Sequence, residues 1–309
     1  MTRTCLASPV GFLIALSFGL GACSGSSASS PADAPGGPSA SVDGTQPSDG
    51  GGVTDGGGGP GVDGSSAVGT AGCSKAAGAT GIQEKTLTVA GKSRRYQLFV
   101  PAGYDAKSPT RLVFVFHGLG GDGDQIRSYL NLEPKAAGRA LIVYPDGLEQ
   151  AEQGGRTAWS LGDVAFFDAM VAEISASRCV DRARVFAAGH SFGAYMSNLV
   201  GCERGDVVRA IAPVSGGIVS GACKGPVAAW LAHGKSDPVV ADSEGIAARD
   251  HWIEANGCAK TSKPASPSSC VTYDGCKAGS PVTWCSWSGG HYPLPSYTTQ
   301  AIWDFFAAL

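Results

Sequence analysis

Apolar residues follow two different patterns along the chain, and together these patterns predict the fold. Leu87 and Val89, and then Tyr96, Leu98 and Val100, alternate with polar residues, which predicts an opening antiparallel hairpin. Beyond Pro101 the apolar residues form short continuous runs instead, typical of strands that are buried on both faces of a parallel sheet. These runs cover residues 112–116, 141–144, 185–188, 210–214 and 227–232.

Helical periodicity appears between the apolar runs. One helical face is predicted within 164–174, a second helix over 192–199, a third over about 243–256 and a last one ending near residue 309. The third should begin with Asp242 or Ser243 as its cap and stop at Gly257. Strands alternating with helices predict an α/β three-layer sandwich, in which a mostly parallel sheet carries the antiparallel hairpin at its start.

Composition divides the 309 residues into three parts. Residues 1–22 combine Arg3, an apolar run and a small pair, Gly21 and Ala22, as an export signal does. Residues 23–72 are expected to be a disordered linker, because 30 of the 49 residues after Cys23 are Gly, Ser or Pro. Residues 73–309 remain for one folded domain.

The end of the export signal resembles a bacterial lipobox. In Leu20-Gly21-Ala22-Cys23 the cysteine would become the lipidated first residue of the mature protein, and Ser24 after it favours the outer membrane. We therefore expect an outer-membrane lipoprotein that faces the periplasm or the cell surface. The alternative is an ordinary cleavable signal and a secreted protein.

Charge and cysteine content narrow the function classes. A net charge of −3, with 16% charged residues, argues against nucleic-acid binding. Eight cysteines remain in the predicted domain, an even number that predicts disulfides in an exported protein, with Cys202 and Cys223 as a plausible local pair. Their spacing does not suggest a zinc site, so we expect neither a metal nor a cofactor. We also expect a monomer.

The motif Gly189-His190-Ser191-Phe192-Gly193 matches a nucleophile elbow. A predicted buried strand precedes it and a predicted helix follows it, as the elbow requires. The glycines are needed because the serine sits on a sharp turn where neighbouring side chains would collide. This context predicts Ser191 as a catalytic nucleophile.

A serine nucleophile needs a base and an orienting acid, in the chain order Ser, Asp, His for this type of sheet. His291 is the predicted base, because it lies in a Gly-rich turn between the last strand and the last helix. Asp237 is the predicted acid, since it follows the strand after the nucleophile helix, and Asp242 is its nearest rival. The other histidines are given different roles: structural turns for His117 and His233, a ring pointing away from Ser191 for His190, and a helix position for His251.

A Gly-rich loop, His117-Gly118-Leu119-Gly120-Gly121, follows the first long buried strand. It would supply an oxyanion hole, with the backbone N–H groups of Leu119 and Phe192 as donors and Gly120 as a possible substitute for Leu119. A phosphate-binding use is disfavoured because no Lys-Ser/Thr pair follows the loop.

Six motifs together resemble the group of feruloyl esterases, acetylxylan esterases and polyhydroxybutyrate depolymerases. They are Phe116-His117-Gly118, Asp163-Val164-Ala165-Phe166, the elbow, Arg209-Ala210-Ile211-Ala212-Pro213-Val214-Ser215-Gly216, His233-Gly234 with Asp237, and Gly289-Gly290-His291. The resemblance spans about residues 83–309 and implies the α/β-hydrolase fold. Cys258, Cys270, Cys276 and Cys285 resemble the cysteine-rich tail of feruloyl esterases. Ala194 departs from the group's pattern, which leaves the shape of the acyl pocket open.

The resemblance implies a serine esterase that acts on plant cell-wall polysaccharide esters, as a feruloyl or acetylxylan esterase. A short-chain polyhydroxybutyrate depolymerase is the alternative, and a non-catalytic surface-binding lipoprotein is a more remote one. Trp159, Trp287 and Tyr292 are candidate substrate contacts. The expected partners are an ester substrate and, through the lipid anchor alone, a membrane.

Overall fold

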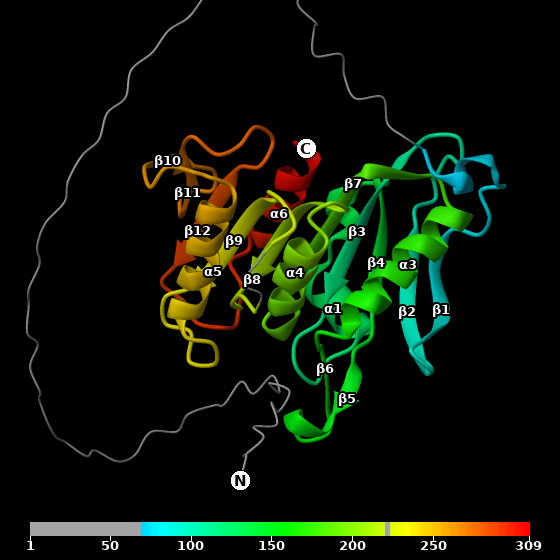
Figure 1. Cartoon of the computed structure of the whole chain (residues 1–309), viewed down its shortest axis with the longest axis horizontal. Coiled ribbons are helices and arrows are strands. Elements are labelled where there is room, and N and C mark those ends of the chain that lie inside the picture. Colours follow the sequence, from blue (N-terminus) through cyan, green and yellow to red (C-terminus); the bar gives the residue numbers. More distant parts are fainter. Residues whose placement is uncertain (1–68, 220–222) are drawn as a thin grey trace, which may run out of the picture. The chain divides into compact units, whose positions relative to one another are not determined.

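A ten-stranded, mostly parallel sheet forms the centre of the domain in the computed structural model, which describes residues 69–219 and 223–309 (Figure 1). The six central strands β4, β3, β7, β8, β9 and β12 run parallel, and the strands at both ends are antiparallel. In spatial order the strands are β1 (Gly81–Val89), β2 (Lys92–Val100), β4 (Ala140–Pro145), β3 (Thr110–Phe116), β7 (Val180–His190), β8 (Val208–Val214), β9 (Ala228–Gly234), β12 (Val282–Trp287), β11 (Cys270–Tyr273) and β10 (Ser262–Ala265).

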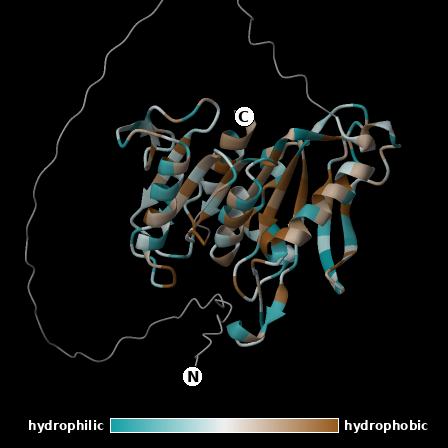
Figure 2. Cartoon of the chain, viewed as in Figure 1, coloured by the Kyte–Doolittle hydropathy of each residue, from teal (hydrophilic) through white to brown (hydrophobic). Residues whose placement is uncertain are grey.

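The opening hairpin and the buried parallel strands are confirmed. β1 and β2 pair through a two-residue turn at Ala90 and Gly91, both of which have positive φ. The apolar run 112–116 is fully buried. Figure 2 shows the same hydrophobic character along the central strands, as expected for strands covered on both faces.

Helices cover both faces of the sheet. α3 (Asp163–Ser177), α4 (Phe192–Glu203) and α5 (Asp242–Ala255) lie on one face (Figure 1). α1 (Gly123–Leu130), α2 (Glu133–Ala136) and α6 (Thr298–Ala307) pack on the other, where the Phe186 and Phe306 rings stack at 4.7 Å. A separate small hairpin joins β5 (Leu148–Gln150) to β6 (Arg156–Ala158), and single 3₁₀ turns cover Ala71–Ser74 and Ala151–Gln153. The predicted three-layer sandwich is therefore confirmed.

Two predicted boundaries change. The residues just before Cys73 were expected in the linker, yet Gly69 pairs with Asp181 and the Thr70 hydroxyl donates to the carbonyl of Arg178 at 2.8 Å. The folded domain therefore includes residues from Gly69 onward. Asp242 and Ser243 are the first two residues of α5, and Ala241 occupies the cap position, so neither of the two predicted residues caps this helix. The predicted signal, Cys23 and the rest of the linker lie outside the described residues.

Four disulfides join the eight cysteines of the domain. The predicted Cys202–Cys223 pair is confirmed. The others are Cys73–Cys179, Cys258–Cys276 and Cys270–Cys285, the last of which links β11 to β12. Four disulfides are consistent with export into an oxidising compartment.

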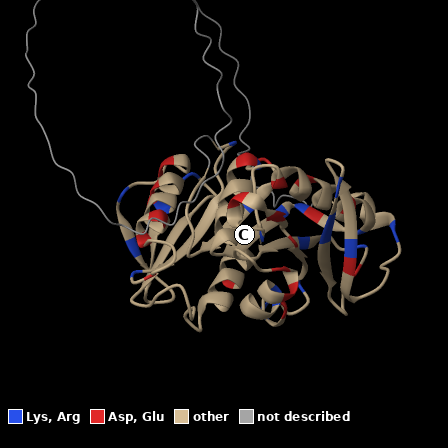
Figure 3. Ribbon diagram, turned by 90° about the horizontal axis from the view of Figure 1, so that it is seen from below, with Lys and Arg blue, Asp and Glu red and all other residues tan. Residues whose placement is uncertain are grey.

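Charged residues of both signs are interspersed over the domain (Figure 3). In the described part of the chain, no helix has the length and apolar character needed to cross a membrane.

Candidate active site

Ser191 sits on a sharp turn between β7 and α4. Its φ of 59° and ψ of −122° lie outside the regions that an L-residue prefers, so the surrounding structure must hold it there. Both flanking glycines are required sterically. A Cβ on Gly189 would lie 2.3 Å from the carbonyl oxygen of Gly193, and one on Gly193 would lie 2.0 Å from that of Phe116. The local geometry is that of a nucleophile elbow.

Backbone hydrogen bonds fix this turn to the sheet. The Ser191 N–H donates to the carbonyl of Val214 at the end of β8, over 2.9 Å, and the Ser191 carbonyl accepts from Ala194 N–H at the same distance. Gly118 lies directly beside the serine, since a Cβ there would be 3.4 Å from the Ser191 Cβ. The Gly-rich loop after β3 and the elbow after β7 therefore face each other.

His291 and Asp237 form a buried hydrogen-bonded pair. The distance from His291 Nδ1 to Asp237 Oδ2 is 2.7 Å, and both side chains are almost fully buried. The other carboxylate oxygen, Oδ1, accepts from the backbone N–H groups of Val239 at 2.8 Å and Val240 at 2.9 Å. Burial acts to raise the pKa of Asp237, but the hydrogen bonds from His291, Val240 and Val239 outweigh it and hold that pKa below its usual value. Asp237 is therefore an ionised acceptor for His291.

Two loops bring this pair to the carboxyl edge of the sheet, where Ser191 also lies. The Lys235 N–H donates to the Trp287 carbonyl, and the Ser236 N–H donates to the Gly289 carbonyl, so the loops after β9 and β12 are joined. Because β7, β9 and β12 are parallel members of one sheet, their ends meet at one edge. His291 lies in the loop between β12 and α6, as its sequence position predicts.

His190 links the elbow to the His291 loop. Its ring is buried, and the centroids of the His190 and His291 rings are 4.6 Å apart. The Nε2 atom of His190 lies 3.2 Å from the His291 carbonyl oxygen. Burial, with His291 beside it, lowers the pKa of His190 to about 3. His190 is therefore a neutral packing partner of His291.

The Gly-rich loop is held by side chains that the sequence did not identify as partners. His117 donates from Nδ1 to the carbonyl of Gly118 at 2.7 Å, and its Nε2 accepts the Gly147 N–H at 2.8 Å. Burial lowers the pKa of His117, which favours the neutral ring, and the two hydrogen bonds fix its tautomer. The structural role expected for His117 is therefore to link the backbone of Gly118 to that of Gly147 through its two ring nitrogens.

Backbone hydrogen bonds of the same loop distinguish Leu119 from Gly120 as the predicted donor to the oxyanion. The Gly120 N–H is already used, because it donates to the Thr157 carbonyl at 2.7 Å. The Leu119 N–H makes no backbone hydrogen bond with any residue that the structure describes. Leu119 therefore stays a candidate oxyanion donor and Gly120 does not.

The aromatic candidates occupy different environments. Trp159 is only 4% exposed, and its indole N–H donates to the His117 carbonyl at 2.8 Å, so it supports the Gly-rich loop and is not an open substrate contact. Trp287 is half-buried against the core on the α6 side. Tyr292 is 59% exposed next to His291.

Two neighbours of the site were missed by sequence reasoning. Tyr129, on α1, is 37% exposed, and its ring lies 5.2 Å from that of His190 and 5.7 Å from that of Tyr292. His233 was expected to have a structural turn role, but its Nε2 lies 3.4 Å from Asp237 Oδ2. The sequence feature that could have identified His233 as a neighbour of the site is its position four residues before Asp237 in the same short loop motif.

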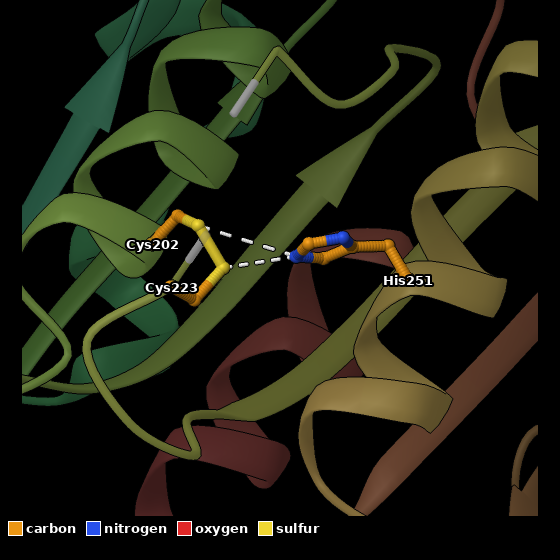
Figure 4. Close-up of side chains that lie close together, drawn as sticks. All are labelled: Cys202, Cys223 and His251. Atoms are coloured by element: carbon orange, nitrogen blue, oxygen red, sulfur yellow. Dashed lines mark hydrogen bonds between the residues drawn. A yellow bond between two sulfur atoms is a disulfide. The ribbon is translucent and has the colours of Figure 1, made fainter. Parts of the chain in front are cut away.

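One cluster in the described ranges has side chains of the kind that bind metals (Figure 4). His251 Nε2 lies 2.9 Å from the sulfur of Cys223 and 4.0 Å from that of Cys202. The two sulfurs are joined in a disulfide and so are not thiolate ligands. We assign no metal to this cluster.

Comparison with known proteins places the chain among esterases. No family model matches it. Over 266 residues it is 33% identical to feruloyl esterase D of Neurospora crassa, covering 77% of this chain and 90% of that protein. It is 36% identical over 232 residues to feruloyl esterase C of Emericella nidulans, covering 70% of this chain and 84% of that protein.

Solved structures agree on the fold. An acetyl xylan esterase from Aspergillus awamori superposes with a TM-score of 0.56 at 14% identity, covering 72% of this chain and 99% of that one. A mutant feruloyl esterase module from Clostridium thermocellum, complexed with sinapinate, gives 0.51 at 13% identity, covering 73% and 86%. With relatives above 30% identity over most of their length, the chain belongs to the feruloyl esterase family and is a carboxylic ester hydrolase of the α/β-hydrolase fold.

Proposed function

We propose that this protein is an exported serine esterase that hydrolyses plant cell-wall esters through an acyl-enzyme. The observation that carries the proposal is the buried His291–Asp237 pair at the same edge of the sheet as an elbow serine held at a φ of 59°. Ser191 attacks the ester carbonyl, and His291 takes the hydroxyl proton and returns it to the leaving alcohol. Water then attacks the acyl-enzyme with His291 again as the base.

Asp237 and the backbone donors supply the electrostatic part of the reaction. An ionised Asp237 accepts from Nδ1 of His291, which leaves Nε2 of that ring to accept the serine proton and stabilises the imidazolium that forms. The N–H groups of Leu119 and Phe192 are the proposed donors to the oxyanion. Donors of this kind contribute about 10²–10³-fold in kcat.

The substrate class follows from the relatives and from the rim of the site. The curated relatives are named feruloyl esterases, and we propose that a feruloyl or acetyl ester of a wall polysaccharide is the substrate here. Three of the large apolar side chains that are exposed in the described ranges lie close to this site. They are Tyr129, Val239 and Tyr292.

Tyr129 and Tyr292 are proposed contacts for the alcohol part of the ester. The imidazole that protonates the leaving alkoxide must face the alcohol, and Tyr292 directly follows that imidazole. Exposed aromatic rings also offer a large contact area at low cost in conformational entropy. Replacing both tyrosines by Ala should raise KM for a feruloylated oligosaccharide more than KM for methyl ferulate. Equal changes for the two esters would contradict this assignment.

A substrate panel tests the proposed function. Initial rates on methyl ferulate, acetylated xylan and polyhydroxybutyrate should favour one of the first two, and Ser191→Ala should abolish them. Preferential release of hydroxybutyrate would instead favour a polyester depolymerase. Absence of hydrolysis on all three esters would contradict the proposal.

We further propose that Cys23 is the lipidated N-terminus and that the linker tethers the domain to the outer membrane. The observation behind it is the lipobox-like sequence before Cys23. Labelling of cells with a fatty acid should mark the wild type and not Cys23→Ala, with Cys5→Ala as the matched control. Unlabelled wild-type protein in the medium would mean ordinary secretion.

A further inference from the structure

His233, at the end of β9, is buried against the loop that carries Asp237. Its ring nitrogen Nε2 lies 3.0 Å from the carbonyl oxygen of Val240 and 3.4 Å from Asp237 Oδ2. Both neighbours are hydrogen-bond acceptors, since Asp237 is ionised. The proton of a neutral His233 ring must therefore be on Nε2.

The opposite side of the ring supports this tautomer. Nδ1 of His233 is buried and has no hydrogen-bond partner within the described residues. A Cβ on Gly245 would lie 2.3 Å from that nitrogen, so the first turn of α5 packs directly on it. A proton on Nδ1 would meet no acceptor there, whereas one on Nε2 meets two.

His233 thereby controls both oxygens of the Asp237 carboxylate. Its Nε2 approaches Oδ2, the oxygen that accepts from His291. Its bond to the Val240 carbonyl closes the loop whose Val239 and Val240 N–H groups donate to Oδ1. One side chain thus positions the carboxylate through its hydrogen bond to the loop, and its Nε2 also lies in electrostatic contact with Oδ2 at 3.4 Å.

We infer that His233 is a positioning residue for the catalytic acid, which it holds in the orientation that His291 requires. The inference rests on the proposed function, because it needs Asp237 to orient the base. It differs from a purely structural role in one respect. The contribution of His233 to the rate should pass through the Asp237 carboxylate, so it should disappear when that carboxylate is removed.

The test is a double-mutant cycle on methyl ferulate hydrolysis. His233→Leu should lower kcat by about tenfold, the equivalent of the one hydrogen bond that holds the loop of Asp237, with KM unchanged. His233→Gln, whose amide N–H can reach the same acceptors, should recover most of that loss. In an Asp237→Asn background, His233→Leu should cause no further loss. His251→Leu, on the far part of α5, is the matched control and should keep the wild-type kcat.

Gly245→Ala gives a second route if His233→Leu does not fold. Its Cβ would displace the His233 ring, and it should lower kcat without raising KM. The inference is overturned if folded His233→Leu or Gly245→Ala keeps kcat within twofold of wild type. It is also overturned if His233→Leu costs as much in the Asp237→Asn background as in the wild type. Full activity of Asp237→Asn alone would instead contradict the proposed function.

Discussion

Acid sensitivity of the folded domain should depend on His190. Burial lowers the pKa of this ring to about 3 in the folded state, while an unfolded chain has a His pKa of about 6.5. Between these two values the unfolded state binds a proton that the folded state does not bind. Stability is therefore fully present above about pH 6.5 and is lost as pH falls toward 3.

The magnitude follows from the difference in proton affinity. Each pH unit below 6.5 costs about 1.4 kcal/mol, so His190 alone should remove about 2 kcal/mol of unfolding free energy between pH 7.5 and pH 5. His117, whose pKa is also lowered by burial, adds to the loss with the same sign.

The assay is urea unfolding at pH 7.5 and pH 5 of wild type and His190→Phe, which keeps a ring beside His291 and removes the titrating group. The free energy of unfolding of the wild type should fall by about 2 kcal/mol more than that of the variant between the two pH values. Equal pH dependence in the two proteins would refute the reasoning, since His190 would then be protonated equally in both states.

Two further predictions concern the framework that holds the site. Gly193→Ala places a Cβ 2.0 Å from the Phe116 carbonyl, so it should destabilise the domain by about 1–3 kcal/mol or more in urea unfolding, and a wild-type midpoint would contradict the elbow geometry. Replacing Cys73 and Cys179 by Ala opens a loop of 106 residues and should cost about 4.7 kcal/mol, against about 3 kcal/mol for Cys270 and Cys285, whose separation is 15. A larger loss from the shorter loop would show that loop entropy does not set the order.

The sequence predicts the central sheet well because its information is local. The buried strands are continuous apolar runs, and an elbow needs glycines at fixed positions around Ser191, so both can be recognised without knowing distant contacts. The order of Ser191, Asp237 and His291 is also a property of the chain, and the structure brings Asp237 and His291 to 2.7 Å.

What the sequence did not predict depends on contacts between distant segments. Trp159 was expected to contact the substrate because it is aromatic. Its indole N–H instead donates to the carbonyl of His117, a residue 42 positions earlier in the chain. The start of the domain was placed at Cys73 because Gly69 and its neighbours have linker composition, although they pack against Asp181 and Arg178. Three of the four cysteine pairings likewise follow from strand and loop neighbours that composition alone does not reveal.

Covalent labelling of the nucleophile tests the central claim most directly. A fluorophosphonate reacts with an activated serine, so the purified protein should take up one equivalent, and peptide mapping should place the label on Ser191. Labelling should abolish hydrolysis of methyl ferulate in parallel, and Ser191→Ala should be neither labelled nor active. A label on another serine, or retention of most activity by Ser191→Ala, would contradict the account.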